Sequence, residues 1–277
     1  MRIIMNKYSL IKILFILLIA IPSTLYALDI TAGATTWVAW GSRFENVHED
    51  SKRRNNTYAF DPTVLYGPAL SIKFNDDFNL TFVYLFGKFN YVEKIYSDAA
   101  GDYFATSRAV RSDSDLALNY RLSNYFKVFA GVKYMAYEVK ISFNDVYTNT
   151  PCDNHSKHTS IGPGLGVSST YPITGNLFLL GTVSGFYLFS AGESFVDNKV
   201  YSNSSVNLTI GYNEYGINST VAAAYYVAEI STVISLGCRF QYFVIKYNDY
   251  KPFFLINSIE NKIYGITLTA TYTFSIF

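Results

Sequence analysis

The sequence has little charge. Only 16% of its 277 residues are charged, whereas about 25% are charged in a typical soluble domain. An ordinary water-facing surface would need more charged side chains than this chain supplies. Its formal net charge is +1, which offers no basic surface to a polyanion, so we expect no nucleic-acid partner.

Cysteine and histidine are also scarce, which limits site chemistry. Of the two cysteines, Cys152 falls in a predicted polar loop and Cys238 on the apolar face of a predicted strand, which does not favour a disulfide. The histidines are His48, His155 and His158, all in or beside predicted loops, and no cysteine–histidine spacing suits zinc. Asp153 with His155 and His158 offers a surface metal site as the alternative to an ordinary solvated loop. We predict no metal and no cofactor.

Long apolar runs are missing after the N-terminal segment. Arg2, Lys7 and Lys12 precede the apolar run 13–21, and a cleavage position follows Ala27, as in a secretory signal peptide. The run is shorter than the roughly 20 residues that a membrane-spanning helix needs. We therefore predict a signal peptide over residues 1–27 and a single domain over 28–277. Any membrane crossing in that domain must use strands.

The C-terminal segment shows the alternation of such a strand. Ile266, Leu268, Ala270, Tyr272 and Phe274 are separated by glycine, threonine or serine, so one strand face is apolar and the other wettable. Aromatic residues make up 18% of the chain and suit the interfacial girdles of membrane barrels. The pattern predicts an all-β fold: a transmembrane antiparallel up-and-down barrel with lipid outside and polar groups inside.

Alternation and turn signals predict about ten strands, an even number as in bacterial single-chain barrels. They are residues 28–41, 58–74, 78–89, 104–122, 126–141, 158–171, 177–190, 218–228, 231–247 and 262–277. Short periplasmic turns are expected at 75–77, 123–125, 172–176 and 229–230, and long exterior loops at 42–57, 90–103, 142–157, 191–217 and 248–261. Segment 191–217 is the least certain, because 205–210 alternates; we interpret it as a hairpin above the barrel, with eight or twelve strands as alternatives.

One predicted strand carries its charges on a single face. Arg111, Asp113, Asp115 and Arg121 alternate with mostly apolar residues, and a cation at the middle of a barrel's lipid face costs about 2–4 kcal/mol. These charges must therefore face the lumen. The turn at 123–125 sets Asp115 opposite Lys133, so we predict an ion pair there. The complete predicted lumen network is Arg111, Asp113, Asp115, Arg121, Lys133 and Arg239, and the same register sets Arg121 against Lys127 at the wet periplasmic mouth.

Two short motifs raise enzyme alternatives. His158-Thr159-Ser160 resembles the His-x-Ser motif of the lipid A deacylase barrels, which implies a serine nucleophile and a histidine base. Asp113 and Asp115 with Asp153 and His155 resemble the acid pair and Asp-His pair of the omptin proteases. However, Ser160 is predicted to face the lumen rather than lipid, and the aspartate pair lies near mid-membrane while His155 lies in an exterior loop. We predict that the protein is not an enzyme, with no catalytic residues.

As a whole, residues 28–277 resemble the small bacterial outer-membrane barrels of outer-membrane protein A-like and opacity type. The resemblance rests on periodicity, a signal peptide and an aromatic C-terminus, and it implies a bacterial outer-membrane location. The expected partners are outer-membrane lipid and lipopolysaccharide, the barrel-assembly machinery and a surface ligand bound through loops such as the one holding Lys52, Arg53 and Arg54. The predicted role is envelope structure or surface contact over a side-chain-filled lumen; a narrow solute channel is the alternative.

Overall fold

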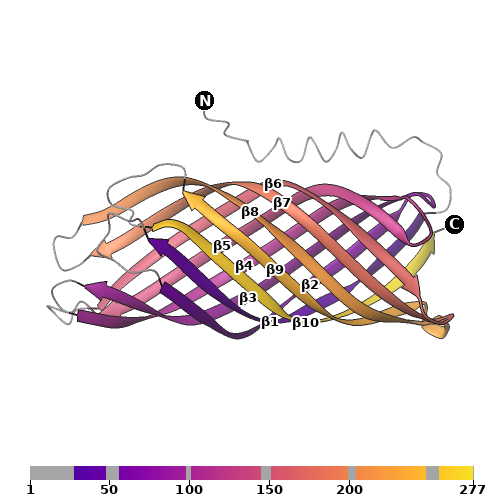
Figure 1. Cartoon of the computed structure of the whole chain (residues 1–277), viewed down its shortest axis with the longest axis horizontal. Coiled ribbons are helices and arrows are strands. Elements are labelled where there is room, and N and C mark those ends of the chain that lie inside the picture. The colour runs from indigo at the N-terminus through magenta and orange to yellow at the C-terminus, as the bar shows by residue number, and fades with distance from the viewer. Residues whose placement is uncertain are drawn as a thin grey trace, which may run out of the picture.

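The computed structural model describes residues 28–47, 56–97, 101–144, 151–198, 204–247 and 256–276. These residues form a closed antiparallel barrel in which each strand pairs with its neighbours in sequence and β1 pairs with β10 (Figure 1). The strands are β1 (Leu28–Val47), β2 (Asn56–Lys73), β3 (Phe78–Ser97), β4 (Gly101–Arg121), β5 (Phe126–Asn144), β6 (Pro151–Pro172), β7 (Leu177–Asn198), β8 (Ser204–Val227), β9 (Thr232–Tyr247) and β10 (Ile256–Ile276). The predicted ten-stranded up-and-down barrel is confirmed. The predicted signal peptide lies outside the described residues.

The short connections lie at one end of the barrel. Ser123 and Asn75 close two of them: the Ser123 hydroxyl accepts from the amides of Tyr125 and Phe126, and Asn75 Oδ1 accepts from Asp77 and Phe78. The turn before β9 is a single 3-10 turn, Ala228–Ile230. No helix in the described ranges is long and apolar enough to cross a membrane.

The strands are longer than the sequence predicts, and this corrects several predicted loops. Pairing continues to Ser97↔Gly101 between β3 and β4 and to Asn144↔Pro151 between β5 and β6. Cys152, predicted in a loop, therefore belongs to β6. The apolar alternation stops where both faces of a strand meet water. The backbone hydrogen bonds between the strands do not depend on this alternation, so the pairing continues beyond it. The hairpin interpretation of 191–217 is confirmed, because β7 and β8 pair out to Asn198↔Ser204.

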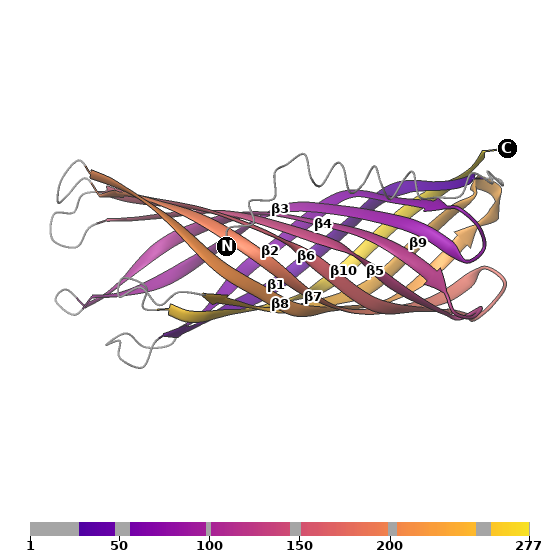
Figure 2. The same cartoon turned by 90° about the horizontal axis from the view of Figure 1, so that it is seen from above.

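These lengths make the barrel taller than a membrane. The strands cross the barrel obliquely in both views (Figures 1 and 2). A strand of 20 residues, such as β1, is about 66 Å long and rises about 50 Å at a tilt of about 40°. The apolar exterior band of such a barrel is about 25 Å tall. Roughly half of the wall therefore projects beyond the hydrocarbon, on the side away from the short turns.

The exterior follows the predicted alternation. Leu165 and Leu236 are 65% and 59% exposed, while the inward Trp37 and Phe243 are fully buried. Aromatic pairs lie near the short turns, at Phe78–Tyr120 and Tyr125–Tyr171. A second set lies higher on the wall, at Tyr66–Phe86 and Tyr187–Phe189. The apolar exterior between two aromatic girdles is the pattern of a membrane-spanning barrel.

Candidate functional site in the barrel lumen

The lumen contains a buried charged group at its centre. Arg111 and Asp113 on β4 are 0% and 1% exposed, and Arg111 donates two hydrogen bonds to the Asp113 carboxylate, Nε to Oδ1 at 2.9 Å and Nη2 to Oδ2 at 2.6 Å. The guanidinium also donates to the Gln241 side-chain oxygen from β9. The rings of Tyr137 and Phe243 lie 5.3 and 5.5 Å from its central carbon. Hydrogen bonds from Nε and Nη2 and two ring faces thus replace water around most of this cation, while Nη1 is buried without a hydrogen-bond partner among the described residues.

The second pair lies nearer the turns. Asp115 on β4 is opposite Lys133 on β5 in the register, and Lys133 Nζ lies 2.9 and 3.1 Å from its two carboxylate oxygens. The Lys133 side chain is 3% exposed and that of Asp115 is 38% exposed. The structure therefore brings together the two charges that the register predicts as a pair, with Lys133 the more deeply buried.

The remaining two predicted residues make other contacts. Arg239 on β9 stacks over Trp37, with its central carbon 4.6 Å from the ring centroid. Arg121 is exposed at the end of β4 and donates to Asn124 in the turn at 3.3 Å. Its register partner is Lys127. Arg121 therefore belongs to the mouth of the barrel at the short turns, where water screens the like charge, and not to the buried group.

Sequence reasoning missed a second fully buried carboxylate. Glu214 on β8 is fully buried, and Ser160 on β6 donates to its Oε1 at 2.6 Å. Ser190 on the intervening β7 donates in turn to Ser160 at 2.8 Å. Glu214 lies in the predicted hairpin 191–217. The alternation over residues 212–218 places Glu214 on the same strand face as Tyr212, and this signal could have identified it as an inward residue. Glu214 thus adds a carboxylate to the predicted network of Asp113 and Asp115.

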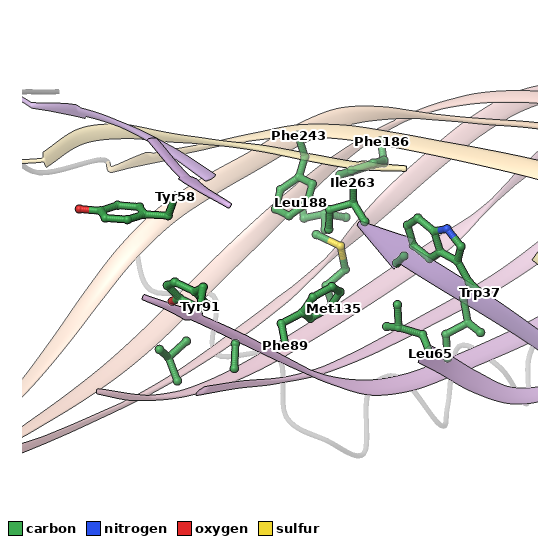
Figure 3. Close-up of a cluster of buried hydrophobic side chains, with 14 residues drawn as sticks. Trp37, Tyr58, Leu65, Phe89, Tyr91, Met135, Phe186, Leu188, Phe243 and Ile263 are labelled. Carbon is green, nitrogen blue, oxygen red and sulfur yellow. The ribbon is translucent and has the colours of Figure 1, made fainter. Parts of the chain in front are cut away.

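Apolar side chains close the lumen around these charges. Figure 3 shows Met135, Leu188, Phe243 and Ile263 gathered together, with Trp37 and Leu65 beside them. All six are at most 2% exposed and belong to one buried cluster. We call this cluster, with Arg111, Asp113 and Gln241, the lumen plug. Below it, toward the short turns, a partly open cavity of about 360 Å³ is lined by Asp115, Lys133, Asn119, Asn218 and Arg239.

The residues of the two enzyme motifs do not converge. His158 faces inward, where its ring meets the edge of Tyr212 at 5.5 Å, and no described carboxylate hydrogen-bonds it. Ser160 binds Glu214 instead. His155 Nε2 lies 2.9 Å from Glu138 Oε1 on the outer face of the wall, whereas Asp113 is inside. The Asp153 side chain lies outside the described residues.

Metal-ligating groups are equally dispersed. Among the residues with described positions, no group of three or more His, Cys, Asp or Glu side chains could hold a metal ion. His155 and His158 point to opposite faces of the wall, so they cannot share one ion as the surface-metal alternative requires. Cys238 is a free thiol on the exposed outer face.

Comparison with solved structures supports the fold. The chain is similar to the outer membrane protease OmpT from Escherichia coli, with 14% identity over 91% of this chain and 98% of that chain and a TM-score of 0.59. Weaker likenesses include the translocator domain of the autotransporter NalP from Neisseria meningitidis (11% identity, 96% of each chain, TM-score 0.41) and OprG from Pseudomonas aeruginosa (11% identity, 90% and 96%, TM-score 0.35). No family model and no curated protein matches the chain.

The closed ten-stranded wall, the apolar exterior and this likeness together define the class. The chain has the fold of a bacterial outer-membrane β-barrel. At this identity the likeness to a protease shows the fold alone.

Proposed function

We propose that this protein is a non-conducting, non-enzymatic barrel that contributes to envelope structure and carries a tall strand extension for contact at the cell surface. The single observation that carries the proposal is the lumen plug. Trp37, Phe243 and Met135 fill the bore at mid-height together with the Arg111–Asp113 pair, and each is completely or almost completely buried. A lumen filled by its own side chains leaves no continuous water path, as expected for narrow barrels.

The chemistry of the buried polar groups supports the non-enzymatic part. Asp113 is bound by Arg111, Asp115 by Lys133 and Ser160 by Glu214. A general base or nucleophile must instead reach a reacting atom on the substrate. Carboxylates held by a cation or by a hydroxyl donor of the same wall are the arrangement of a packed polar core.

The height of the wall supports the contact role. On β5, outward residues change from Val132 and Tyr134 to Glu138 and Lys140, and the strand continues to Asn144. This upper part is built like the membrane part but has a charged exterior. It carries the ends of the strands well above the lipid surface, and binding residues of many scaffolds lie at such strand ends.

A narrow channel is the second candidate, and the cavity below the plug favours it. That cavity is partly open and lined by charges of both signs, as a vestibule for small solutes would be. Conduction would require the plug to move aside.

The deciding experiment is ion conductance of the purified protein in planar bilayers. We expect no steady current from the wild type. A variant with a smaller plug, Trp37→Ala with Phe243→Ala, should pass current and shows that the assay detects an open bore. A steady current from the wild type would establish the channel instead, provided that substitutions outside the lumen leave this current unchanged.

Incubation with peptide and acylated glycolipid substrates tests the enzyme alternative. Turnover by the wild type that is lost in Ser160→Ala or Asp113→Asn would overturn the proposal.

A further inference from the structure

Four basic side chains gather on the outer face of neighbouring strands β3 to β6. They are Lys88, Arg108, Lys140 and Lys157, all exposed, and we call them the outer basic patch. Their strands are consecutive in the barrel. Two register rows hold them: Lys88, Val110, Glu138 and Lys157 form the lower row, and Asn90, Arg108, Lys140 and His155 the upper.

The patch contains a like-charge contact that the protein neutralises only in part, through Glu138. Arg108 and Lys140 are directly opposite each other on β4 and β5, with Cβ atoms about 5 Å apart, an arrangement that is destabilising for like charges. Glu138 is the carboxylate within the patch, and it lies 3.8 Å from Lys140 Nζ and 2.9 Å from His155 Nε2. In the described part of the chain, Lys88, Arg108 and Lys157 form no ion pair. Glu193 lies opposite Lys157 at the edge of the patch, also without an ion pair.

The height of the patch places it at the level of lipid headgroups. Six residues below Lys140 toward the turns, the outward residue on β5 is Tyr134, and the same register row holds two more aromatic residues, Tyr84 on β3 and Phe189 on β7. Aromatic rings mark the membrane–water interface. On β4, β5 and β6, the row between carries the small side chains Ser112, Ala136 and Thr159. These leave a shallow shelf on the wall directly beneath the cations.

We propose that the outer basic patch binds the phosphorylated sugar headgroup of lipopolysaccharide. Arg108 and Lys140 are close enough to hold one phosphate between them, with the guanidinium fork and the ammonium both donating to its oxygens. Lys88 and Lys157 flank this pair and meet the remaining charge. The small-residue shelf accommodates the sugar, and the acyl chains run down the apolar wall past Val132 and Leu165. A bound phosphate turns the unfavourable Arg108–Lys140 contact into a favourable one.

The test is titration of the full-length protein in phosphatidylcholine nanodiscs with purified bisphosphorylated lipopolysaccharide. We expect Arg108→Gln with Lys140→Gln to weaken binding at least tenfold. The matched control is Lys246→Gln with Lys262→Gln, which removes two outward, exposed cations from β9 and β10 and should change the affinity less than twofold. Enzymatically dephosphorylated lipopolysaccharide should bind the wild type as weakly as the patch variant binds the intact lipid.

Three outcomes overturn the proposal. They are an unchanged affinity in the patch variant, an equal loss in the control variant, and phosphatidylglycerol binding as tightly as lipopolysaccharide, which would reduce the patch to a general anionic surface. The thermal unfolding midpoint of the patch variant in lipid-free detergent should equal or exceed that of the wild type, because the substitutions relieve a repulsion. A folded variant keeps the binding result interpretable, and none of these outcomes depends on whether the lumen conducts.

Discussion

Ser160 on β6 and Glu214 on β8 are joined by a 2.6 Å hydrogen bond across the lumen face of β7. The two strands are not neighbours in the wall, and Ser190 on β7 completes the chain of donors at 2.8 Å. Three consecutive strands are therefore tied together by side chains as well as by their ladders.

The first prediction concerns this connection. Glu214→Gln keeps an oxygen that accepts from Ser160, so the free energy of unfolding in detergent should change by less than about 1 kcal/mol. Glu214→Leu removes the acceptor and should destabilise by about 1–3 kcal/mol, the usual cost of stranding buried hydrogen-bonding groups. Urea unfolding followed by tryptophan fluorescence measures both. Equal effects of the two substitutions would show that charge, and not the hydrogen bond, is what matters at this position.

The second prediction concerns the asymmetry of the Asp115–Lys133 pair. Asp115→Leu leaves the nearly fully buried Lys133 ammonium without its partner, which should cost about 3 kcal/mol. Lys133→Met leaves only the partly solvated Asp115 carboxylate, so we expect about 1 kcal/mol. The double variant should be more stable than Asp115→Leu alone. The same unfolding assay gives the coupling free energy, and an equal cost for the two single substitutions would contradict the observed difference in burial.

The third prediction concerns the lipid face. Leu165 is 65% exposed on the outer surface of β6, so Leu165→Arg should cost about 2–4 kcal/mol of folding into vesicles. The control is Thr159→Arg, on the same face of the same strand but beyond the apolar band, which should cost about 0–1 kcal/mol. A larger penalty at Thr159 than at Leu165 would mean that the membrane is placed incorrectly along the wall.

The fourth prediction uses the free thiol. Cys238 lies on the exposed outer face of β9, between Leu236 and Phe240, where hydrocarbon should exclude a charged reagent. In a Cys152→Ser background reconstituted in vesicles, Cys238 should resist a charged, water-soluble maleimide but react with an apolar one. The control is a triple variant, Cys152→Ser with Cys238→Ser and Glu229→Cys, whose single thiol lies in the short turn. This thiol should react with both maleimides when they are added from the side that the turn faces. Rapid labelling of Cys238 by the charged reagent would place it in water.

The sequence predicts the wall better than it predicts the interior. Lipid imposes a period of two on every membrane-crossing strand, so the outward phase of Val132 and Leu165 and the opposition of Asp115 and Lys133 can be derived from alternation and turn length. That constraint ends at the hydrocarbon boundary. The upper parts of β3, β6 and β8 therefore read as polar loops, although their backbones continue to pair.

The lumen plug is harder to predict for a different reason. Trp37 and Phe243 are large and apolar yet face inward, so composition alone would assign them to lipid. Only the phase of the whole strand reveals their side, and their contacts depend on the closure of ten strands around one axis. Glu214 was missed because its segment could be judged a hairpin but not a continuation of the charged interior. Gln241, by contrast, shares a face with Arg239, and that signal was available.

The β1–β10 seam has a consequence for how the protein assembles. The other ladders join strands that follow one another directly in the sequence, so their pairing can begin at a nearby turn. At the seam, Thr31 and Thr273 touch through their hydroxyls at 3.0 Å although they are 242 positions apart, and Thr35 meets Thr269 at 2.7 Å. Closing so long a segment has a large entropic cost before any contact offsets it. Joining the first strand to the last should therefore be the slowest kinetic step, and substitutions at these threonines should retard barrel formation more than equal changes within the β7–β8 hairpin.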